Sequence, residues 1–142
     1  QADLKTMTCL GVYGMSAITA LTAQNTCGVR DVLEATPEFV GEQLDCIFED
    51  IRPQTVKIGM VSSAPIIRTI GAKLRQYGAE NVVVDPVMVS TSGSSLMQDS
   101  ALTALREELF PLAALITPSG CAASPSRRRR TCCGRRRPSA GP

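Results

Sequence analysis

The sequence predicts an α/β fold, a partial three-layer sandwich around a mainly parallel sheet. Two observations carry this prediction. The segment 81–86 contains three consecutive valines with no polar residue between them, which is typical of a strand buried on both faces, as strands of parallel sheets are. Short apolar segments also alternate with stretches of helical periodicity over residues 1–118, the order expected of strands joined by right-handed helical crossovers.

Each element follows from a local pattern. Thr36 and Pro37 suit the N-cap and first turn of a helix, and apolar residues then recur every three or four positions as far as Ile51. A second helix begins near Ser63 and ends at Gly78. The other predicted elements are a helix over residues 2–10, a buried strand over 16–23, strands over 55–60, 81–86 and 114–117, and a helix capped by Asp99.

The chain divides into two regions of different composition. Residues 1–118 contain all 13 acidic residues and eight of the 15 basic ones, a net charge of −5. Residues 119–142 contain seven arginines and no aliphatic side chain larger than alanine, so they cannot bury enough apolar surface to offset the entropy cost of ordering. We predict one partial domain over 1–118 and a disordered tail over 119–142, which we interpret as the product of a shifted reading frame.

Several protein classes are excluded by composition. The six cysteines form no Cys-x-x-Cys pair and the chain has no histidine, which argues against a zinc site. No apolar run reaches the roughly 18 residues of a membrane helix, and the start lacks a signal sequence. We therefore expect a cytoplasmic protein with reduced cysteines and no membrane partner.

Polar residues after the predicted strands are the candidates for chemistry, because ligands of parallel α/β sheets bind outside the carboxyl ends of the strands. Asp85 directly follows the three valines. A carboxylate there could serve a magnesium–phosphate site, or it could begin a turn with Pro86. Gln24 follows the first predicted strand; its amide could read a heteroaromatic ring, or it could belong to a polar loop.

Other features also allow two interpretations. Gly59 and Met60 could line a ligand or simply end a strand. Lys57 could pair with a carboxylate or extend to solvent, with catalysis the weaker alternative. The polar loop 90–95 could bind phosphate but lacks P-loop spacing. The arginine runs in the tail could bind nucleic acid, yet they have no aromatic partners, and we expect no nucleic-acid partner.

Several strings together resemble one family. They are QADLKT at 1–6, LGVYGMSAITALTAQNT at 10–26, VKIGM at 56–60, NVVVDPVMVSTSG at 81–93 and LITP at 115–118. The chain resembles the hydroxymethylpyrimidine/phosphomethylpyrimidine kinases over residues 1–118. The resemblance implies a ribokinase-like fold, ATP and Mg²⁺ as cofactors, and two successive phosphorylations of 4-amino-5-hydroxymethyl-2-methylpyrimidine in thiamine biosynthesis. It also implies a homo-oligomer.

The resemblance assigns roles to particular residues. Gln24 matches the position that hydrogen-bonds the aminopyrimidine, and Thr22, Met60 and Val87 match neighbouring positions of that pocket. Asp3 and Asp85 match acidic positions near the phosphates and magnesium, without being assigned as direct metal ligands. Phosphoryl transfer depends mainly on positioning and charge neutralisation, which suits carboxylates beside Mg²⁺.

The chain also departs from the family pattern. The Gly-Gly-Ala-Gly-Ile segment that precedes the position of Gln1 is absent, and Ser119 and Ala122 stand where the family has the Asn and Glu of an Asn-x-x-Glu motif. No counterpart of the catalytic Cys or Asp or of the glycine-rich anion hole occurs. We therefore expect the polypeptide to be inactive by itself. The alternatives are a pyridoxal kinase-like member of the superfamily and a non-enzymatic nucleic-acid-binding protein.

Overall fold

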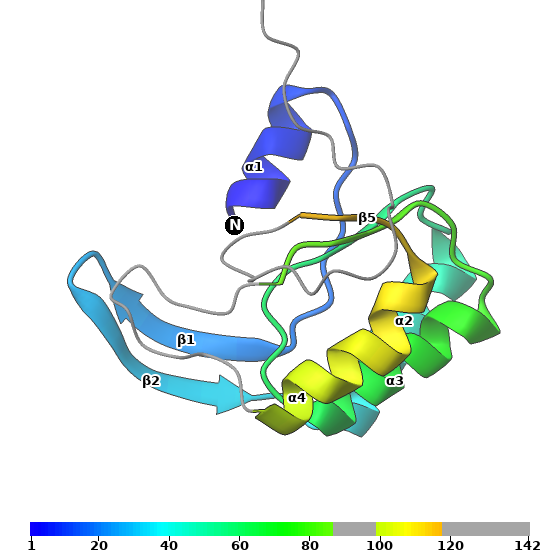
Figure 1. The fold of residues 1–142 in the computed structure, drawn as a ribbon. Helices are drawn as coiled ribbons and strands as arrows, with labels where there is room; N and C mark the ends of the chain where they lie inside the picture. Colours follow the sequence, from blue (N-terminus) through cyan, green and yellow to red (C-terminus); the bar gives the residue numbers. More distant parts are fainter. Residues whose placement is uncertain (87–98, 118–142) are drawn as a thin grey trace, which may run out of the picture.

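The computed structural model describes residues 1–86 and 99–117 (Figure 1). The elements in chain order are α1 (Ala2–Cys9), β1 (Ala20–Asn25), β2 (Gly28–Glu34), α2 (Pro37–Asp50), β3 (Val56–Ile58), α3 (Ala64–Gln76), β4 (Val82–Val84), α4 (Asp99–Ala104), the π-helical turn η1 (Leu105–Leu109), the 3₁₀ turn η2 (Phe110–Leu112) and β5 (Ala113–Ile116). The predicted disordered tail and the loop 90–95 lie outside the described residues.

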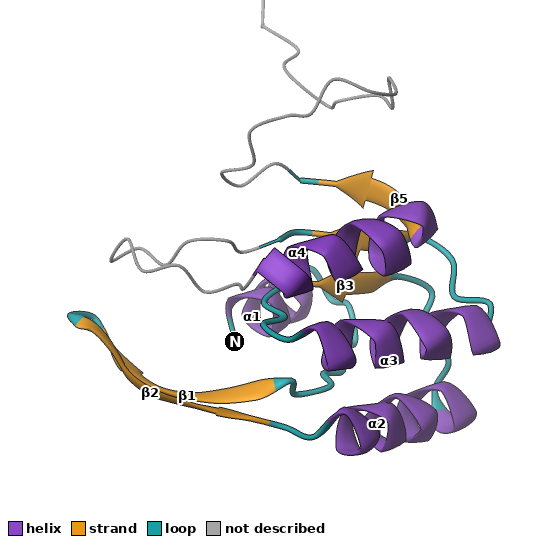
Figure 2. Cartoon of the chain, turned by 60° about the horizontal axis from the view of Figure 1, so that its bottom comes forward, coloured by secondary structure: helices purple, strands orange, loops and turns teal. Residues whose placement is uncertain are grey.

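A three-stranded parallel sheet, in the order β3-β4-β5, organises the body. Val83 lies between Lys57 on β3 and Leu115 on β5 in this register. Val82 and Val84 are completely buried while Val83 is partly exposed, so β4 is covered more thoroughly on one face than on the other. Helices α2, α3 and α4 lie on that covered side, and α1 lies on the opposite side (Figures 1 and 2). The α/β class and the parallel sheet are confirmed.

Helix α3 supplies the centre of the hydrophobic core. Its apolar side chains recur every three or four residues, so they share one face of the helix. The buried members are Ile66, Ile67, Ile70 and Leu74, and Leu105 and Leu109 of η1 belong to the same core cluster. Gly78 follows the helix at φ +55°, a left-handed conformation that glycine adopts without steric cost, and this ends α3 where the sequence predicts.

Helix α2 begins as the sequence predicts and is joined to α3 by polar contacts. The Thr36 hydroxyl accepts a hydrogen bond from the Phe39 amide at 3.2 Å, an N-cap. Lys73 Nζ lies 2.6 Å from Asp45 Oδ2, and the Tyr77 hydroxyl donates to Asp45 at 2.8 Å. The hydrogen bonds from Lys73 and Tyr77 lower the pKa of Asp45, whereas the hydrogen bond to Asp45 raises the pKa of Tyr77.

The prediction for residues 16–23 is wrong in two respects. The strand there, β1, starts at Ala20 and pairs antiparallel with β2, so it forms a separate hairpin and not a member of the parallel sheet. After Ala20 every residue of β1 is exposed. The small and β-branched residues of this segment fit a strand of either kind, and sequence alone does not show that its partner is the following segment 28–34.

The last strand is also less buried than the sequence suggests. Ala113 is buried, but the next three residues of β5 are exposed. Strand β5 is the edge of the described sheet, and an edge strand lacks a neighbour on one side. The apolar run ALIT therefore predicted the strand correctly and its burial incorrectly. Within the described residues, no helix is long and apolar enough to cross a membrane.

The packing of α3 predicts the effect of truncating its core side chains. Ile67 is completely buried whereas Ile51 is 47% exposed. Ile67→Ala should lower the free energy of unfolding by about 2–5 kcal/mol because it removes buried methyl groups and leaves a cavity. Ile51→Ala, the matched control, should change it by less than about 0.5 kcal/mol. Urea denaturation followed by circular dichroism measures both, and equal losses would contradict this description of the core.

The lowered pKa of Asp45 predicts how stability depends on pH. The carboxylate takes up a proton less readily in the folded chain than in the unfolded one, so the unfolded state gains protons first as the pH falls. The contribution of Asp45 should be intact above about pH 4, the ordinary range of this group, and should fade below it. Denaturation midpoints measured across this range should fall less steeply for Asp45→Asn than for the wild type. Parallel profiles would refute the assignment.

Candidate functional site

Polar side chains from three adjacent strands and from α1 meet at the carboxyl edge of the parallel sheet. Asp85 follows β4, and its amide donates to the Ile58 carbonyl at the end of β3 at 2.8 Å. Thr117 follows β5, and its amide donates to the Val84 carbonyl at 3.0 Å. The backbone ladder thus fixes the Asp85 side chain between the ends of the two flanking strands.

Both carboxylate oxygens of Asp85 have partners. Oδ1 accepts a hydrogen bond from the Thr117 hydroxyl at 2.5 Å, and Oδ2 lies 3.3 Å from Lys57 Nζ. The Lys57 and Asp85 side chains are 27% and 29% exposed, so the pair remains open to solvent. A carboxylate next to a buried strand needs such compensation, and here β3 and β5 each provide one polar group.

Lys57 links Asp85 to α1. Its Nζ donates to Asp3 Oδ2 at 2.8 Å, and Asp3 is part of the first turn of α1. Partial burial lowers the pKa of Lys57, but the hydrogen bonds and charges of Asp3 and Asp85 outweigh burial, and the pKa is raised overall. Lys57 is therefore a firmly protonated ammonium shared by two carboxylates.

This arrangement suits phosphate chemistry at the sheet edge. Two carboxylates and one ammonium leave one net negative charge. Mg²⁺ usually binds one or two carboxylates together with waters and substrate phosphates, so Asp85 and Asp3 fit a phosphate-bound magnesium ion. Within residues 1–86 and 99–117, no group of three or more His, Cys, Asp or Glu side chains forms a dedicated metal cage. Any ion held here would take its remaining ligands from elsewhere.

The β1–β2 hairpin projects from the body beside this edge (Figure 2). Its base is anchored there: the Thr19 hydroxyl donates to the Met60 carbonyl at 3.1 Å, and Glu34 accepts a hydrogen bond from the Ser62 hydroxyl. On the side of α2, the Gln43 amide group accepts from the Ile18 amide at 2.8 Å and donates to its carbonyl at 3.0 Å. The hairpin is thus joined to the loop that follows β3 and to α2.

The register of the hairpin gives Thr22 and Gln24 a common face. Side chains of a strand alternate, so Ala20, Thr22 and Gln24 lie on one side. Glu34 pairs directly with Ala20 and therefore shares that side, on which it reaches Ser62 beyond β3. The bulge between Ala23 and Gln24 inserts a residue into β2, which leaves the alternation of β1 unchanged.

The structure brings some of the predicted residues together. Asp3 and Asp85 converge on Lys57, and Met60 joins the hairpin base. Gln24 follows no strand of the parallel sheet: it lies near the exposed tip of the hairpin, which corrects its expected place. Val87 lies outside the described residues.

Sequence reasoning missed Thr117 and left Lys57 undecided. The pairing alternative for Lys57 is confirmed by its two carboxylate partners. Thr117 carried one usable signal, since it directly follows a strand, as Asp85 does. The sequence does not show that Thr117 contacts Asp85, because it does not show that β5 lies next to β4 in the sheet.

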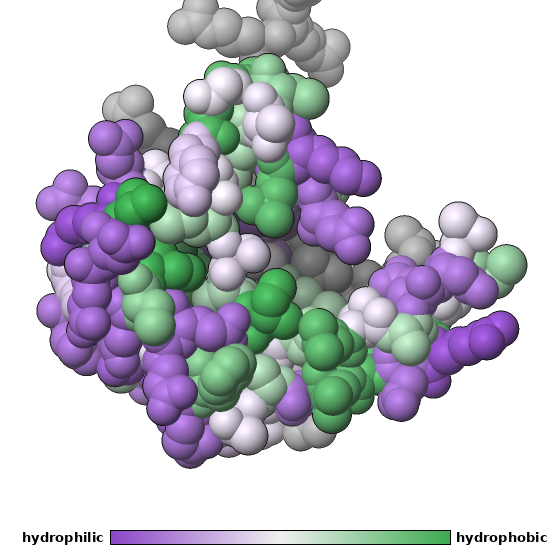
Figure 3. All heavy atoms as spheres, turned by 180° about the vertical axis from the view of Figure 1, so that it is seen from behind, coloured by the Kyte–Doolittle hydropathy of each residue, from purple (hydrophilic) through white to green (hydrophobic). Residues whose placement is uncertain are grey.

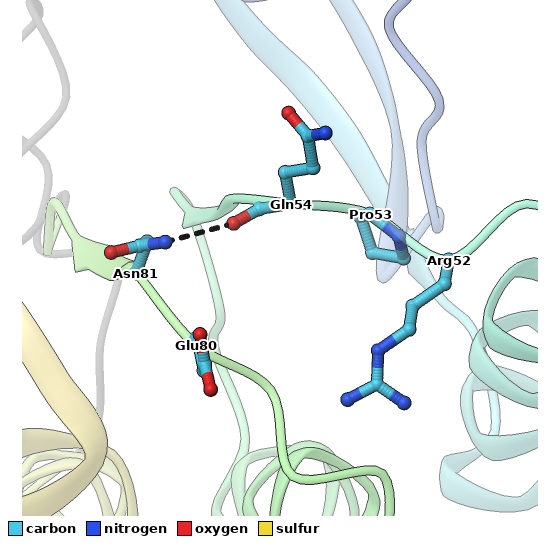
Figure 4. A pocket seen from close by; sticks show the side chains of 5 residues that line it. All are labelled: Arg52, Pro53, Gln54, Glu80 and Asn81. Carbon is cyan, nitrogen blue, oxygen red and sulfur yellow. Dashed lines mark hydrogen bonds between the residues drawn. The ribbon is translucent and has the colours of Figure 1, made fainter.

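A pocket of about 460 Å³ lies at the opposite, amino-terminal edge of the sheet (Figure 4). Its lining comes from the segments that precede β3 and β4: Arg52, Pro53, Gln54, Glu80 and Asn81. Arg52 donates to the carbonyls of Tyr77 and Gly78 at 2.6 and 3.2 Å, and the Asn81 amide donates to the Gln54 carbonyl at 3.1 Å. These contacts tie the two segments together. Because the pocket lies at the edge of the sheet opposite Lys57 and Asp85, we assign it no part in the chemistry.

Hydrophobic side chains are exposed where the hairpin joins the body (Figure 3). Leu21 and Leu33 face each other across the hairpin and are 61% and 68% exposed. Ile18 and Phe39, in the neighbouring segments, are exposed as well. The hairpin therefore stands out from the core and is not packed into it.

Comparison with known proteins identifies the family of the chain. The family model described as phosphomethylpyrimidine kinase matches residues 1–124. The chain belongs to this family. The hydroxymethylpyrimidine/phosphomethylpyrimidine kinase of Salmonella typhimurium is 49% identical over 119 residues, which are 84% of the chain and 45% of that protein. The chain thus spans under half the length of this relative.

Solved structures of similar kinases agree with the fold. The phosphomethylpyrimidine kinase from Clostridium difficile superposes with a TM-score of 0.76 at 50% identity, over 81% of the chain and 50% of that structure. A pyridoxal kinase from Staphylococcus aureus, in complex with pyridoxal, matches with a TM-score of 0.70 at 31% identity, over 81% of the chain and 41% of that structure. The chain is therefore a phosphomethylpyrimidine kinase family member with a ribokinase-like fold.

The Thr117–Asp85 hydrogen bond predicts a stability change. Thr117→Val keeps the shape of the side chain and removes the hydroxyl donor, so it should lower the free energy of unfolding by about 1 kcal/mol, the usual net contribution of an intramolecular hydrogen bond. Thr55→Val, at an exposed position just before β3, is the matched control and should be nearly neutral. Chemical denaturation measures both, and a neutral Thr117→Val would show that this bond does not hold Asp85.

Proposed function

We propose that the chain carries the pyrimidine-binding and phosphate-facing part of a hydroxymethylpyrimidine/phosphomethylpyrimidine kinase of thiamine biosynthesis. That enzyme transfers a phosphoryl group from ATP to 4-amino-5-hydroxymethyl-2-methylpyrimidine and then to its monophosphate. The convergence of Asp3 and Asp85 on Lys57 at the carboxyl edge of the sheet carries the proposal. Ligands of parallel α/β sheets bind outside this edge, and the family match supports the reaction.

In this proposal the hairpin and the sheet edge bind different parts of the reactants. The Gln24 amide offers both a donor and an acceptor to the aminopyrimidine, with Thr22, Met60 and Val87 as its neighbours in the pocket. Asp85 and Asp3 face the phosphates and lie near the magnesium ion, which would neutralise phosphate charge during transfer. The chain's own residues position the reactants and arrange charge, while ATP supplies the phosphoryl group.

The alternative substrate is pyridoxal, because the chain also resembles pyridoxal kinase at 31% identity. The higher identity to the pyrimidine kinases, 49% and 50%, and the string ALTAQNT around Gln24 favour the pyrimidine. We further propose a cytoplasmic location and, as in the parent family, a homo-oligomeric assembly of the whole enzyme.

Ligand binding tests the proposed substrate. Isothermal titration of the 142-residue chain with 4-amino-5-hydroxymethyl-2-methylpyrimidine should show binding, and titration with pyridoxal should show binding at least about tenfold weaker, a difference of about 1.4 kcal/mol. Gln24→Leu should weaken pyrimidine binding by about 1–3 kcal/mol because the amide is lost and its partners on the ligand remain unpaired.

Gln76→Leu provides the matched control for Gln24→Leu. Gln76 is exposed at the end of α3, on a different element from the hairpin, so its substitution should leave the affinity unchanged. Tighter binding of pyridoxal than of the pyrimidine would favour the alternative substrate. Equal losses in the Gln24 and Gln76 variants would remove Gln24 from the proposed pocket.

Catalytic turnover by this chain alone should be absent. Ser119 and Ala122 stand where the family has the Asn and Glu that organise its phosphate and magnesium site, and a serine and a methyl group cannot supply the same carboxylate charge. Incubation with the pyrimidine, ATP and Mg²⁺, followed by chromatography, should yield no phosphorylated pyrimidine. Formation of the monophosphate at a rate typical of kinases would contradict this expectation.

A further inference from the structure

Helix α1 is attached to the body by unusually little burial. None of its eight residues is buried, whereas α2 and α3 each bury at least four. The residues of α1 also lie on the side of the sheet away from α2, α3 and α4 (Figure 1). A polar contact consequently matters more for the placement of α1 than for the other helices.

Among the described residues, the ion pair of Asp3 with Lys57 links α1 to the sheet. Lys57 lies on β3 beside Val83 of β4, and Val83 is the less buried of the three valines, so Lys57 faces the side of α1. Its Nζ is 2.8 Å from Asp3 and 3.3 Å from Asp85. Without this ammonium the carboxylates of Asp3 and Asp85 would share the site with no positive charge between them, and like charges so placed repel each other.

We propose that Lys57 is a positioning residue that holds α1 on the carboxyl edge of the sheet and so keeps Asp3 beside Asp85. Its side chain reaches from the centre of β3 to both carboxylates and cancels one of their two charges. The placement of Asp3 is argued from this contact, whereas its meaning for phosphate binding rests on the proposed function.

The consequence for chemistry is a net charge of one negative unit at the site. A pair of uncompensated carboxylates would repel the phosphates of a nucleotide, and a site with no negative charge would not attract a magnesium ion. One ammonium between two carboxylates leaves a single negative charge, which a phosphate-bound cation can share. Lys57 acts through Asp3 and Asp85, and we assign it no direct contact with the reactants.

Hydrogen exchange of the α1 amides tests the proposal in the intact 142-residue chain. Lys57→Met should speed exchange of the amides in α1 about fivefold, the effect of losing a partly exposed ion pair, while amides of α3 keep their protection. Lys57→Arg retains the charge and should restore slow exchange. Lys73→Met is the matched control, because the Lys73 side chain is as exposed as that of Lys57 (24% and 27%) and pairs with Asp45 between α3 and α2; it should leave the exchange of α1 unchanged.

A double-mutant cycle separates a specific tether from a general loss of stability. Asp3→Asn should speed exchange of α1 as Lys57→Met does, and the double variant should exchange no faster than Lys57→Met alone. If amides throughout the Lys57→Met variant exchange faster, that variant has lost stability in general. The Asp3→Asn variant then decides between a specific tether and a general effect, since Asp3 is exposed and its substitution should speed exchange in α1 selectively.

Any of three results would overturn the proposal. The α1 amides could exchange at the wild-type rate in Asp3→Asn, or Lys73→Met could speed their exchange as much as Lys57→Met does. The third result is a double variant in which the effects of the Asp3 and Lys57 substitutions add. The exchange experiment requires no substrate, so its outcome is independent of the pyrimidine titration. A chain that shows the coupling and binds no pyrimidine would refute the proposed function and leave the positioning role of Lys57 intact.

Discussion

The central constraint on this structure is the carboxylate of Asp85 at the end of the buried strand β4. Burial of Val82 and Val84 beneath the helices fixes the strand, and the chain must then leave the core with a charged residue. The flanking strands compensate that charge from both sides, through Lys57 and Thr117. The polar edge and the hydrophobic core are therefore consequences of the same three-strand register.

The two sides of the sheet have different roles. One side is packed by α2, α3 and α4 and provides stability through buried aliphatic side chains. The other side carries Lys57 and α1, where burial is slight and contacts are ionic. Ion pairs that remain open to solvent contribute little to stability, which leaves this side free to exchange its contacts for those of a ligand.

The hairpin illustrates how a family motif can be present while its local environment differs from what the sequence suggests. Thr22 and Gln24 lie on one face of an exposed two-stranded ribbon, and such a ribbon is marginally stable by itself. Its attachments are the contacts of its base with Met60, Ser62 and Gln43. Those contacts hold the base of the hairpin beside the carboxyl edge of the sheet and leave Thr22 and Gln24 exposed.

The sequence by itself determined the helices, the parallel strands and the identity of Asp85 as the informative carboxylate. These depend on local signals: Thr36 and Pro37 at a helix start, Gly78 at a helix end, and three valines in succession. The tertiary structure decided that β1 pairs with β2, that β5 is an exposed edge, and that Asp3, Lys57 and Thr117 meet at Asp85. The side-chain contact between Asp3 on α1 and Lys57 on β3 joins residues 54 positions apart, and no periodicity within a short window records which distant segments become neighbours.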